Sequence, residues 1–396
     1  MYSIRLLDDN KVPHPIAFTK TDTGNAPDFH HSSESLTSSR WFLQPAITAS
    51  LAVLPFTEVT PMKAIVYTQA GLPIQDPHAL FDTDLPQPTP GPRDLLVEVK
   101  AIAVNPVDTK VRASRNAEQP QVLGWDAVGV VREVGSAVSL FQPGDEVFYA
   151  GAIDRPGSYS ELHLVDERIV GHKPRSLDYA SAAALPLTSI TAWELLFDRL
   201  GVEERGGKGQ RLLIVGAGGG VGSILVQLAR QLTQLTVIGT ASRPETQQWV
   251  RELGAHHVID HSAALAEQLA AVEQDPVDYV ISLTHTDTYL PQLVQVLRPQ
   301  GKLALIDDPA QLDVMPLKRK SLSLHWELMF TRSLYQTEDM IKQHQLLERV
   351  SALVDQGVIK TTVGEHYGAI NADNLKRAHA LIESGKARGK IVLEGF

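Results

Sequence analysis

The sequence predicts an α/β protein in which a doubly wound parallel sheet is joined to a smaller all-β domain. A short apolar strand, Leu212–Val215, runs directly into a glycine-rich turn and a helix, as at the start of a βαβ unit. Apolar strands then alternate with helical stretches to about residue 333, which is typical of a parallel sheet. Before residue 186 the strands are short and separated by proline and glycine, which favours a small β-barrel.

The start of the chain differs in character from both domains. Residues 1–61 are largely polar and turn-rich, and their more apolar end is interrupted by prolines. We predict that they form a poorly ordered N-terminal extension. The first strand of the folded part is Met62–Tyr67, and Leu95–Val104 and Val128–Gly135 are further strands of the barrel.

The glycine-rich turn predicts a site for a dinucleotide. Glycines let the backbone turn sharply and approach a ligand, and the following helix directs its free N–H groups at an anion. A second strand, Leu235–Gly239, follows at the distance expected of a βαβ unit. The residues of the turn that we assign to the cofactor are Gly218, Gly219, Gly220, Val221 and Gly222.

The residues after that second strand favour NADP over NAD. An NAD site has an acidic residue there to hold the ribose 2′-hydroxyl, whereas this chain has Ala241, Ser242 and Arg243. A hydroxyl beside a guanidinium suits a 2′-phosphate, and no carboxylate is present to repel it. The alternative is that Arg243 is a solvated residue at the start of a helix.

Later strands end near the same site, because ligands of parallel sheets lie at the carboxyl ends of the strands. The strand Val277–Leu283 places Leu283 and Thr284 toward the cofactor, and His285 is a substrate contact or an exposed loop histidine. Thr191, taken as the start of the helix that leads into the nucleotide domain, is also assigned to the cofactor. Polar and apolar residues alternate at the start of Ser321–Phe330, as they do in an edge strand.

Composition excludes several classes of function. The net charge of −10 argues against a nucleic-acid-binding protein, since such affinity comes from clustered Lys and Arg. The absence of cysteine excludes disulfides and thiolate chemistry. The apolar stretches are too short for a membrane span, and the N-terminus lacks a signal-peptide pattern, so we expect a cytoplasmic protein without a membrane partner.

Residues 62–396 resemble the medium-chain dehydrogenase/reductase superfamily, and within it the zinc-free quinone oxidoreductase branch and the zinc-type alcohol dehydrogenase-like proteins. The resemblance implies a GroES-like barrel domain of residues 62–186 and 334–396 and a Rossmann domain of residues 187–333. It also implies an active site in the cleft between them and a homodimer. The resemblance is based on the glycine-rich turn and on five further sequence motifs: Asn105–Asp108, Gly124–Val131, Gly144–Val147, Gly157–Glu161 and Leu185–Leu187.

Two departures from the superfamily bear on the metal. Asn105 stands where the alcohol dehydrogenases have a zinc-binding cysteine, and Trp125 stands where they have a histidine. The lobe with four zinc-binding cysteines is absent as well. Because Asn and Trp supply neither thiolate nor imidazole, we expect no metal site. A zinc alcohol dehydrogenase is the alternative, and it predicts stoichiometric zinc.

The resemblance implies an NADPH-dependent oxidoreductase that reduces quinones or α,β-unsaturated carbonyls. Without zinc, the oxygen that becomes negative needs hydrogen-bond donors or a cation. Lys110 stands where many quinone oxidoreductases carry a tyrosine. It is the leading candidate for polarising that oxygen or donating a proton to it; the alternative is that Lys110 is a solvated surface lysine. Asn105 is a second candidate hydrogen-bond donor to the oxygen, and Asp108 is the residue expected to orient it. Trp125, His325 and Trp326 are assigned to the substrate pocket; for His325 and Trp326 the alternative is a purely structural strand at an interface. The alternative function is an NADPH-binding redox sensor or structural protein with little turnover.

Overall fold

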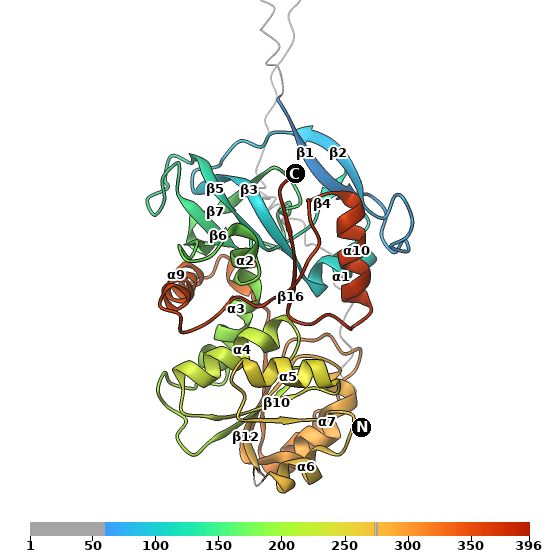
Figure 1. Ribbon diagram of the computed structural model, residues 1–396, viewed down its shortest axis with the longest axis vertical. Coiled ribbons are helices and arrows are strands. Elements are labelled where there is room, and N and C mark those ends of the chain that lie inside the picture. The colour runs from blue at the N-terminus through green and yellow to red at the C-terminus, as the bar shows by residue number, and fades with distance from the viewer. Residues whose placement is uncertain (1–59, 273, 275) are drawn as a thin grey trace, which may run out of the picture. The chain divides into compact units, whose positions relative to one another are not determined.

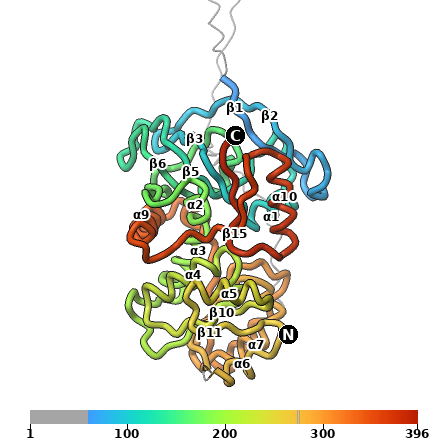
Figure 2. The backbone as a smooth tube through the Cα atoms, viewed as in Figure 1, coloured from blue at the N-terminus to red at the C-terminus, as the bar shows by residue number. Residues whose placement is uncertain are grey.

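The computed structural model describes residues 60–272, 274 and 276–396 of the chain, which form two lobes (Figures 1 and 2). The predicted extension, residues 1–61, therefore lies outside the described residues except for Thr60 and Pro61. The first lobe is built from two sheets. One sheet has the strand order β2-β1-β4. The other has the order β15-β16-β3-β5-β6-β8, with β7 paired to β3. The strands of this lobe are β1 (Pro61–Tyr67), β2 (Phe81–Pro86), β3 (Asp94–Val104), β4 (Gln121–Val122), β5 (Ala127–Val134), β6 (Glu146–Tyr149), β7 (Leu162–Asp166), β8 (Val170–His172), β15 (Val363–His366) and β16 (Lys390–Glu394).

The C-terminal strand brings two distant parts of the chain together in this lobe. Strand β16 runs antiparallel to β3, so that Ile391 pairs with Val104. Lys390 therefore lies beside the loop that begins at Asn105. Most of β3 is buried, which explains its long apolar sequence.

The second lobe is the predicted doubly wound parallel sheet. Its six strands have the order β11-β10-β9-β12-β13-β14, and every pair is parallel. The order reverses between β9 and β12, which is where such sheets bind their ligands. The strands are β9 (Arg211–Val215), β10 (Thr236–Thr240), β11 (His257–Ile259), β12 (Val277–Ser282), β13 (Leu297–Leu305) and β14 (Ser323–Trp326). Strand β14 lies at the edge, as its alternating sequence predicted.

Helices lie against the sheets of both lobes (Figure 1). Those of the first lobe are α1 (Pro106–Ser114), η1 (Glu167–Ile169), α2 (Tyr179–Ala183), α9 (Lys342–Asp355) and α10 (Ala372–Glu383). Those of the second lobe and its approach are α3 (Pro186–Trp193), the π-helix η2 (Glu194–Arg199), α4 (Gly220–Leu232), α5 (Pro244–Glu252), α6 (Leu265–Ala271), α7 (Thr286–Val296), η3 (Met315–Lys320) and α8 (Thr331–Leu334).

The helical run Tyr179–Arg199 corrects two expectations. It is long and apolar enough to cross a membrane, so the apolar stretches are not all too short for a span; 83% of its apolar window is buried in the fold, as in a core helix. Thr191 also does not start a helix. Helix α3 begins at Pro186, because proline suits the first helical position, and Thr191 lies inside it.

Candidate active site

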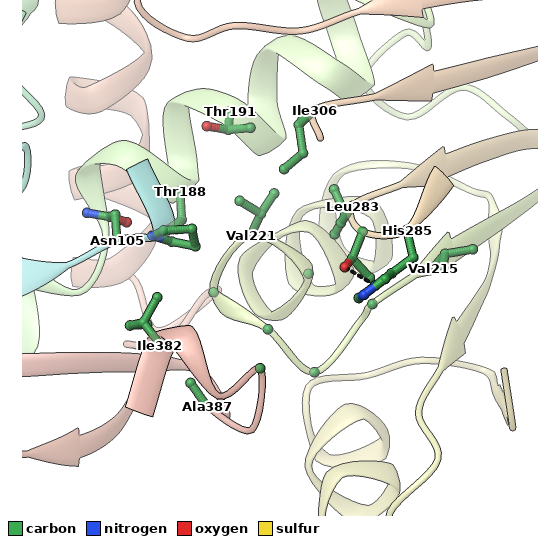
Figure 3. A pocket seen from close by; sticks show the side chains of 18 of the residues that line it. Asn105, Thr188, Thr191, Val215, Val221, Leu283, His285, Ile306, Ile382 and Ala387 are labelled. Atoms are coloured by element: carbon green, nitrogen blue, oxygen red, sulfur yellow. Dashed lines mark hydrogen bonds between the residues drawn. The ribbon is translucent and has the colours of Figure 1, made fainter. Parts of the chain in front are cut away.

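A cavity of about 520 Å³ lies where the barrel lobe meets the carboxyl ends of the parallel strands. In Figure 3, Asn105, Ile382 and Ala387 approach it from one side, Leu283 and His285 from the other, and Val221 lies between them. The predicted residues that line this cavity are Asn105, Lys110, Thr191, Gly218, Gly219, Gly220, Val221, Gly222, Ser242, Arg243, Leu283, Thr284 and His285.

One end of the cavity is shaped for a phosphate. Gly216 has φ +81°, which favours glycine, and a Cβ on Gly222 would lie 2.5 Å from the Gly216 carbonyl oxygen. Helix α4 begins here with Gly219 as N-cap, so no side chain caps its first N–H groups. The buried Thr246 hydroxyl also has no partner among the described residues. These donors fit a dinucleotide pyrophosphate.

The next part of the cavity carries the predicted ribose contacts. Ala241 is buried, and Ser242 and Arg243 follow it along the lining. The Arg243 side chain is 42% exposed, and its Nη2 donates to the Lys386 carbonyl at 3.0 Å. Arg243 therefore has donors left for a ligand, because a guanidinium carries five N–H groups.

At the other end, the Asn105 side chain is held by a buried lysine. Its Nδ2 donates to the Ala103 carbonyl at 3.3 Å and to Asp126 Oδ2 at 2.9 Å, and its Oδ1 accepts from Lys390 Nζ. Lys390 Nζ also donates to Asp126 Oδ2 at 2.8 Å and to the Val104 carbonyl at 3.2 Å. Burial raises the pKa of Asp126, and the Lys390 charge opposes that shift.

This network changes the role that the sequence suggested for Asn105. Both N–H groups of its amide, and all three of the Lys390 ammonium, are already bonded inside the protein. Asn105 therefore cannot donate to a substrate without giving up an internal bond. Its side chain forms part of the cavity wall.

Asp108 is buried behind that wall and does not line the cavity. Its Oδ2 accepts from the Asn105 backbone N–H at 2.9 Å and from the Tyr159 hydroxyl at 2.7 Å. Its Oδ1 has no partner among the described residues. Burial raises the pKa of Asp108 to about 7. Asp108 thus caps α1 and positions the Asn105 backbone.

Lys110 reaches across the cleft. It comes from α1 of the barrel lobe, and its Nζ lies 2.7 Å from Oδ2 of Asp308, which follows β13 in the other lobe. Both residues line the cavity, and the Lys110 side chain is 54% exposed. One carboxylate contact leaves two of its three N–H groups for a ligand.

The carboxyl end of β12 supplies the predicted Leu283, Thr284 and His285 to the lining. Thr284 Oγ1 and His285 Nδ1 lie 2.6 Å apart (Figure 3). His285 has φ +50°, a left-handed conformation that is uncommon outside glycine and that fixes its direction at the start of α7.

Three predicted pocket residues do not line the cavity. Trp125 is buried in the barrel core, where its Nε1 donates to the Ala152 carbonyl at 3.1 Å and its ring packs edge-on against Phe330. His325 and Trp326 lie within β14, and Trp326 is 51% exposed. The lining residues of this stretch are instead those after the carboxyl end of the strand, Glu327 to Phe330.

Sequence reasoning missed several residues of the lining, above all Lys390 and Glu327. The available signal for Lys390 was a single lysine at the start of the apolar run Ile391–Leu393. For Glu327 it was a carboxylate directly after an edge strand. His261 and Tyr289, whose rings meet edge-on at 6.0 Å, also line the cavity and carried no recognisable signal.

The residues at the metal position of the alcohol dehydrogenases do not fit zinc. Asn105 is bonded to an ammonium and Trp125 is turned into the core. Within the part of the chain that the structure describes, no three His, Cys, Asp or Glu residues are grouped so that they could hold a metal ion. Zinc prefers thiolate, imidazole and carboxylate ligands, and a cation beside the site repels it.

Comparisons with known proteins agree with this architecture. The alcohol dehydrogenase GroES-like domain family matches residues 91–175, and the zinc-binding dehydrogenase family matches residues 253–393. A zinc-type alcohol dehydrogenase-like protein of Staphylococcus epidermidis is 40% identical over 316 residues, which is 79% of this chain and 93% of that protein.

Two solved structures extend the comparison. A putative zinc-dependent alcohol dehydrogenase from Rhizobium etli has 57% identity and a TM-score of 0.83, over 85% of this chain and 98% of that one. The Escherichia coli quinone oxidoreductase complexed with NADPH has 26% identity and a TM-score of 0.72, over 84% of this chain and 99% of that one.

Proposed function

The chain belongs to the medium-chain dehydrogenase/reductase superfamily of oxidoreductases, and we propose that it reduces quinones or α,β-unsaturated carbonyls with NADPH and without catalytic zinc. One observation carries the proposal. A single cavity joins the uncapped start of α4 and the Ser242–Arg243 pair to a wall in which the Lys390 ammonium is bonded to Asn105.

The cofactor fits the first part of this cavity. The N–H groups at the start of α4 would hold the pyrophosphate, and Ser242 and Arg243 would hold the 2′-phosphate. NADPH, when bound, supplies a hydride. The presence of Ser242 and Arg243 in the lining supports NADPH over NADH, because NAD sites have an acidic residue after this strand where this chain has Ala241.

The protein must then stabilise the negative oxygen that a reduced enone or quinone acquires. Lys110 is the cation available in the cleft, and its ammonium has free donors beside Asp308. Asn105 shapes the pocket wall, and Asp108 and Lys390 hold Asn105 in place. Leu328, Met329 and Phe330 add apolar surface, which suits an uncharged, hydrophobic substrate.

The proposal is tested by mixing the purified protein with NADPH and a panel of quinones and enones while the NADPH absorbance is followed. We expect oxidation of NADPH with members of the panel. Binding of NADPH, measured by fluorescence, without its oxidation by any acceptor would overturn the reductase and favour a redox sensor. Elemental analysis separates the metal question: we expect activity without bound zinc, and stoichiometric zinc would contradict zinc independence.

We further propose a homodimer formed at the edge of the parallel sheet. Strand β14 ends that sheet within the described residues, so its outer backbone groups face outward. Two large apolar side chains, Trp326 on this strand and Leu328 just after it, are exposed. An open strand edge with exposed apolar residues suits pairing with a second copy.

A further inference from the structure

A short segment of the barrel lobe lies against the glycine-rich turn of the other lobe. This segment, Gly385–Gly389, connects α10 to β16, and we call it the strap. Gly385, Ala387 and Gly389 line the cavity, which Ala387 approaches from the barrel side in Figure 3. Gly385 and Lys386 are exposed, whereas Gly389 is buried. The strap therefore runs from the surface into the contact between the two lobes.

Two anchors hold the end of the strap on the nucleotide lobe. The Gly389 N–H donates to the Gly218 carbonyl of the glycine-rich turn at 3.0 Å. The Arg388 guanidinium lies over the ring of Trp249 on α5, 5.1 Å from the ring centre, which is a cation–π contact. The ring is itself fixed, because its Nε1 donates to the Ser223 hydroxyl of α4 at 2.8 Å. One backbone contact and one side-chain contact thus tie the strap to the elements that form the cofactor end of the cavity.

A third contact of the strap reaches the residue that we assign to the 2′-phosphate. The Lys386 carbonyl accepts from Arg243 Nη2 at 3.0 Å. On another side of the guanidinium, Glu245 Oε1 lies 3.5 Å from Arg243 Nε. Arg243 is therefore contacted both by a carboxylate of its own lobe and by a backbone carbonyl of the barrel lobe.

These contacts leave Arg243 able to bind an anion. They engage Nε and one N–H group of Nη2, which leaves three of the five N–H groups of a guanidinium for a ligand. The side chain is 42% exposed, and fixing a long exposed side chain at the moment of binding costs conformational entropy. A guanidinium that is already held in place avoids part of that cost.

We propose that the strap positions Arg243 for the 2′-phosphate, so that the preference for NADPH depends on the barrel lobe as well as on the nucleotide lobe. The proposal rests on the cofactor assignment made above. The strap is a positioning element, because its Lys386 carbonyl acts through Arg243 and not on the cofactor. The coupling works in both directions, so a 2′-phosphate bound to Arg243 stabilises the strap in turn.

The charge of Arg388 provides a second route by which the strap can favour a phosphate, namely direct attraction. The two routes differ in their dependence on Arg243. Positioning has no effect once Arg243 is removed, whereas direct attraction persists. A double-mutant cycle between the two arginines therefore separates them.

The first test applies this cycle to cofactor binding, with fluorescence titrations of NADPH and NADH. Arg388→Ala should raise the NADPH dissociation constant by roughly 2- to 5-fold, the lower range for one cation–π contact, and should affect NADH little. In the Arg243→Ala background, Arg388→Ala should have no further effect on NADPH. An unchanged NADPH dissociation constant in Arg388→Ala, equal weakening of NADPH and NADH, or effects that add in the double variant would each overturn the proposal.

The matched control is a cation–π arginine inside the barrel lobe. Arg377 on α10 lies over the Tyr367 ring at 4.7 Å, and neither residue lines the cavity. Arg377→Ala should leave both dissociation constants unchanged. Trp249→Leu removes the anchor of the strap from the other lobe without changing any charge. It should weaken NADPH selectively as well, and it replaces Arg388→Ala if that variant does not fold.

The second test follows the strap itself by hydrogen exchange and mass spectrometry. The Gly389 N–H is bonded across the two lobes, so its exchange reports the opening of the strap. Saturating NADPH should slow the exchange of the strap more than saturating NADH does, and this difference should vanish in Arg243→Ala. The peptide of η3, Met315–Lys320, is the internal control and should exchange equally in all states. Equal exchange of the strap with NADPH and with NADH would contradict the link between the strap and the 2′-phosphate.

The outcomes separate this proposal from the function on which it rests. If the wild type does not bind NADPH in preference to NADH, the cofactor assignment and the role of the strap fail together. If it prefers NADPH and the cycle shows no coupling between Arg388 and Arg243, only the role of the strap fails. Neither test needs turnover, so the result does not depend on which acceptor the protein reduces.

Discussion

Lys390 Nζ lies 2.8 Å from Asp126 Oδ2 in the core of the barrel lobe, although the two residues are 264 positions apart in the sequence. Both side chains are almost completely removed from water. A buried charge that loses its partner is costly, because neither water nor another charge compensates it. Replacing Lys390 by the similarly long but uncharged methionine should therefore lower the free energy of unfolding by about 3–5 kcal/mol.

The effect of Lys390→Met is measured by urea unfolding. The double variant Lys390→Met, Asp126→Asn should recover part of the loss, because it removes the unpaired carboxylate as well. A Lys390→Met protein whose stability is within about 0.5 kcal/mol of the wild type would show that the pair does not hold the wall.

Asp108 predicts a pH dependence of stability. Its pKa is about 7 in the folded protein, against about 4 in the unfolded chain. Between these values the folded state holds a proton that the unfolded state has lost, so the free energy of unfolding falls as the pH rises. The fall amounts to at most about 4 kcal/mol, and it is complete above about pH 7.

The variant Asp108→Asn checks this prediction, because its free energy of unfolding should not fall with pH through the titration of residue 108. Urea unfolding of both proteins at about pH 5 and about pH 8 measures it, and the variant should gain stability relative to the wild type as the pH rises. Equal slopes for the two proteins would mean that Asp108 is ionised across the whole range.

Lys110 predicts a loss of rate without a loss of stability. Lys110→Met should lower kcat for an enone by roughly 10²-fold, as removal of one oxyanion donor does in other enzymes. The unfolding midpoint should hardly change, since exposed ion pairs contribute little to stability. Asp308→Asn is the matched control, because it breaks the same ion pair and keeps the ammonium. Equal losses of rate in both variants would point to the ion pair and not to the Lys110 charge.

Arg243 predicts cofactor preference. Arg243→Ala should weaken NADPH binding by roughly 10- to 100-fold, the range for one charged hydrogen bond, and should weaken NADH binding far less. Fluorescence titration with each cofactor measures the two dissociation constants. Arg251→Ala changes an exposed arginine outside the lining and serves as control. Equal weakening of NADPH and NADH in Arg243→Ala would contradict the assignment of the 2′-phosphate.

Trp326 predicts the oligomeric state. If the edge of β14 pairs with a second copy, Trp326→Lys places a charge in the contact, and light scattering after size exclusion should show a monomer where the wild type shows a dimer. Met315→Lys tests an exposed apolar residue on η3 instead and should leave the dimer intact. A monomeric wild type would contradict the homodimer.

Local patterns were sufficient for the fold and for placing the glycine-rich turn at one end of the cavity. The apolar strand before Gly216, the glycines and the helix are neighbours in the chain, so their spacing predicts their geometry directly. The alternation of apolar strands and helices likewise predicts the parallel sheet, because each unit buries its apolar face against the next.

The chemistry of the other end depends on contacts that no local pattern contains. Lys390 meets Asn105 only because β16 pairs with β3, and Glu327 meets Arg199 only because the chain after β14 lies against η2. The misplacement of His325 has a related cause. The position at which β14 ends decides which residues of Ser321–Phe330 reach the cavity. The alternation of polar and apolar residues does not show where the strand ends.

The closing strand also sets when the cavity can form during synthesis. The Gly389 N–H donates to the Gly218 carbonyl of the dinucleotide turn at 3.0 Å, and Lys390 completes the wall beside Asn105. A nascent chain that has emerged only as far as α10 can already contain every strand of the parallel sheet, yet it lacks both contacts. We therefore expect that a chain truncated after α10 would contain the strands of the parallel sheet but would lack these two contacts of the pocket wall.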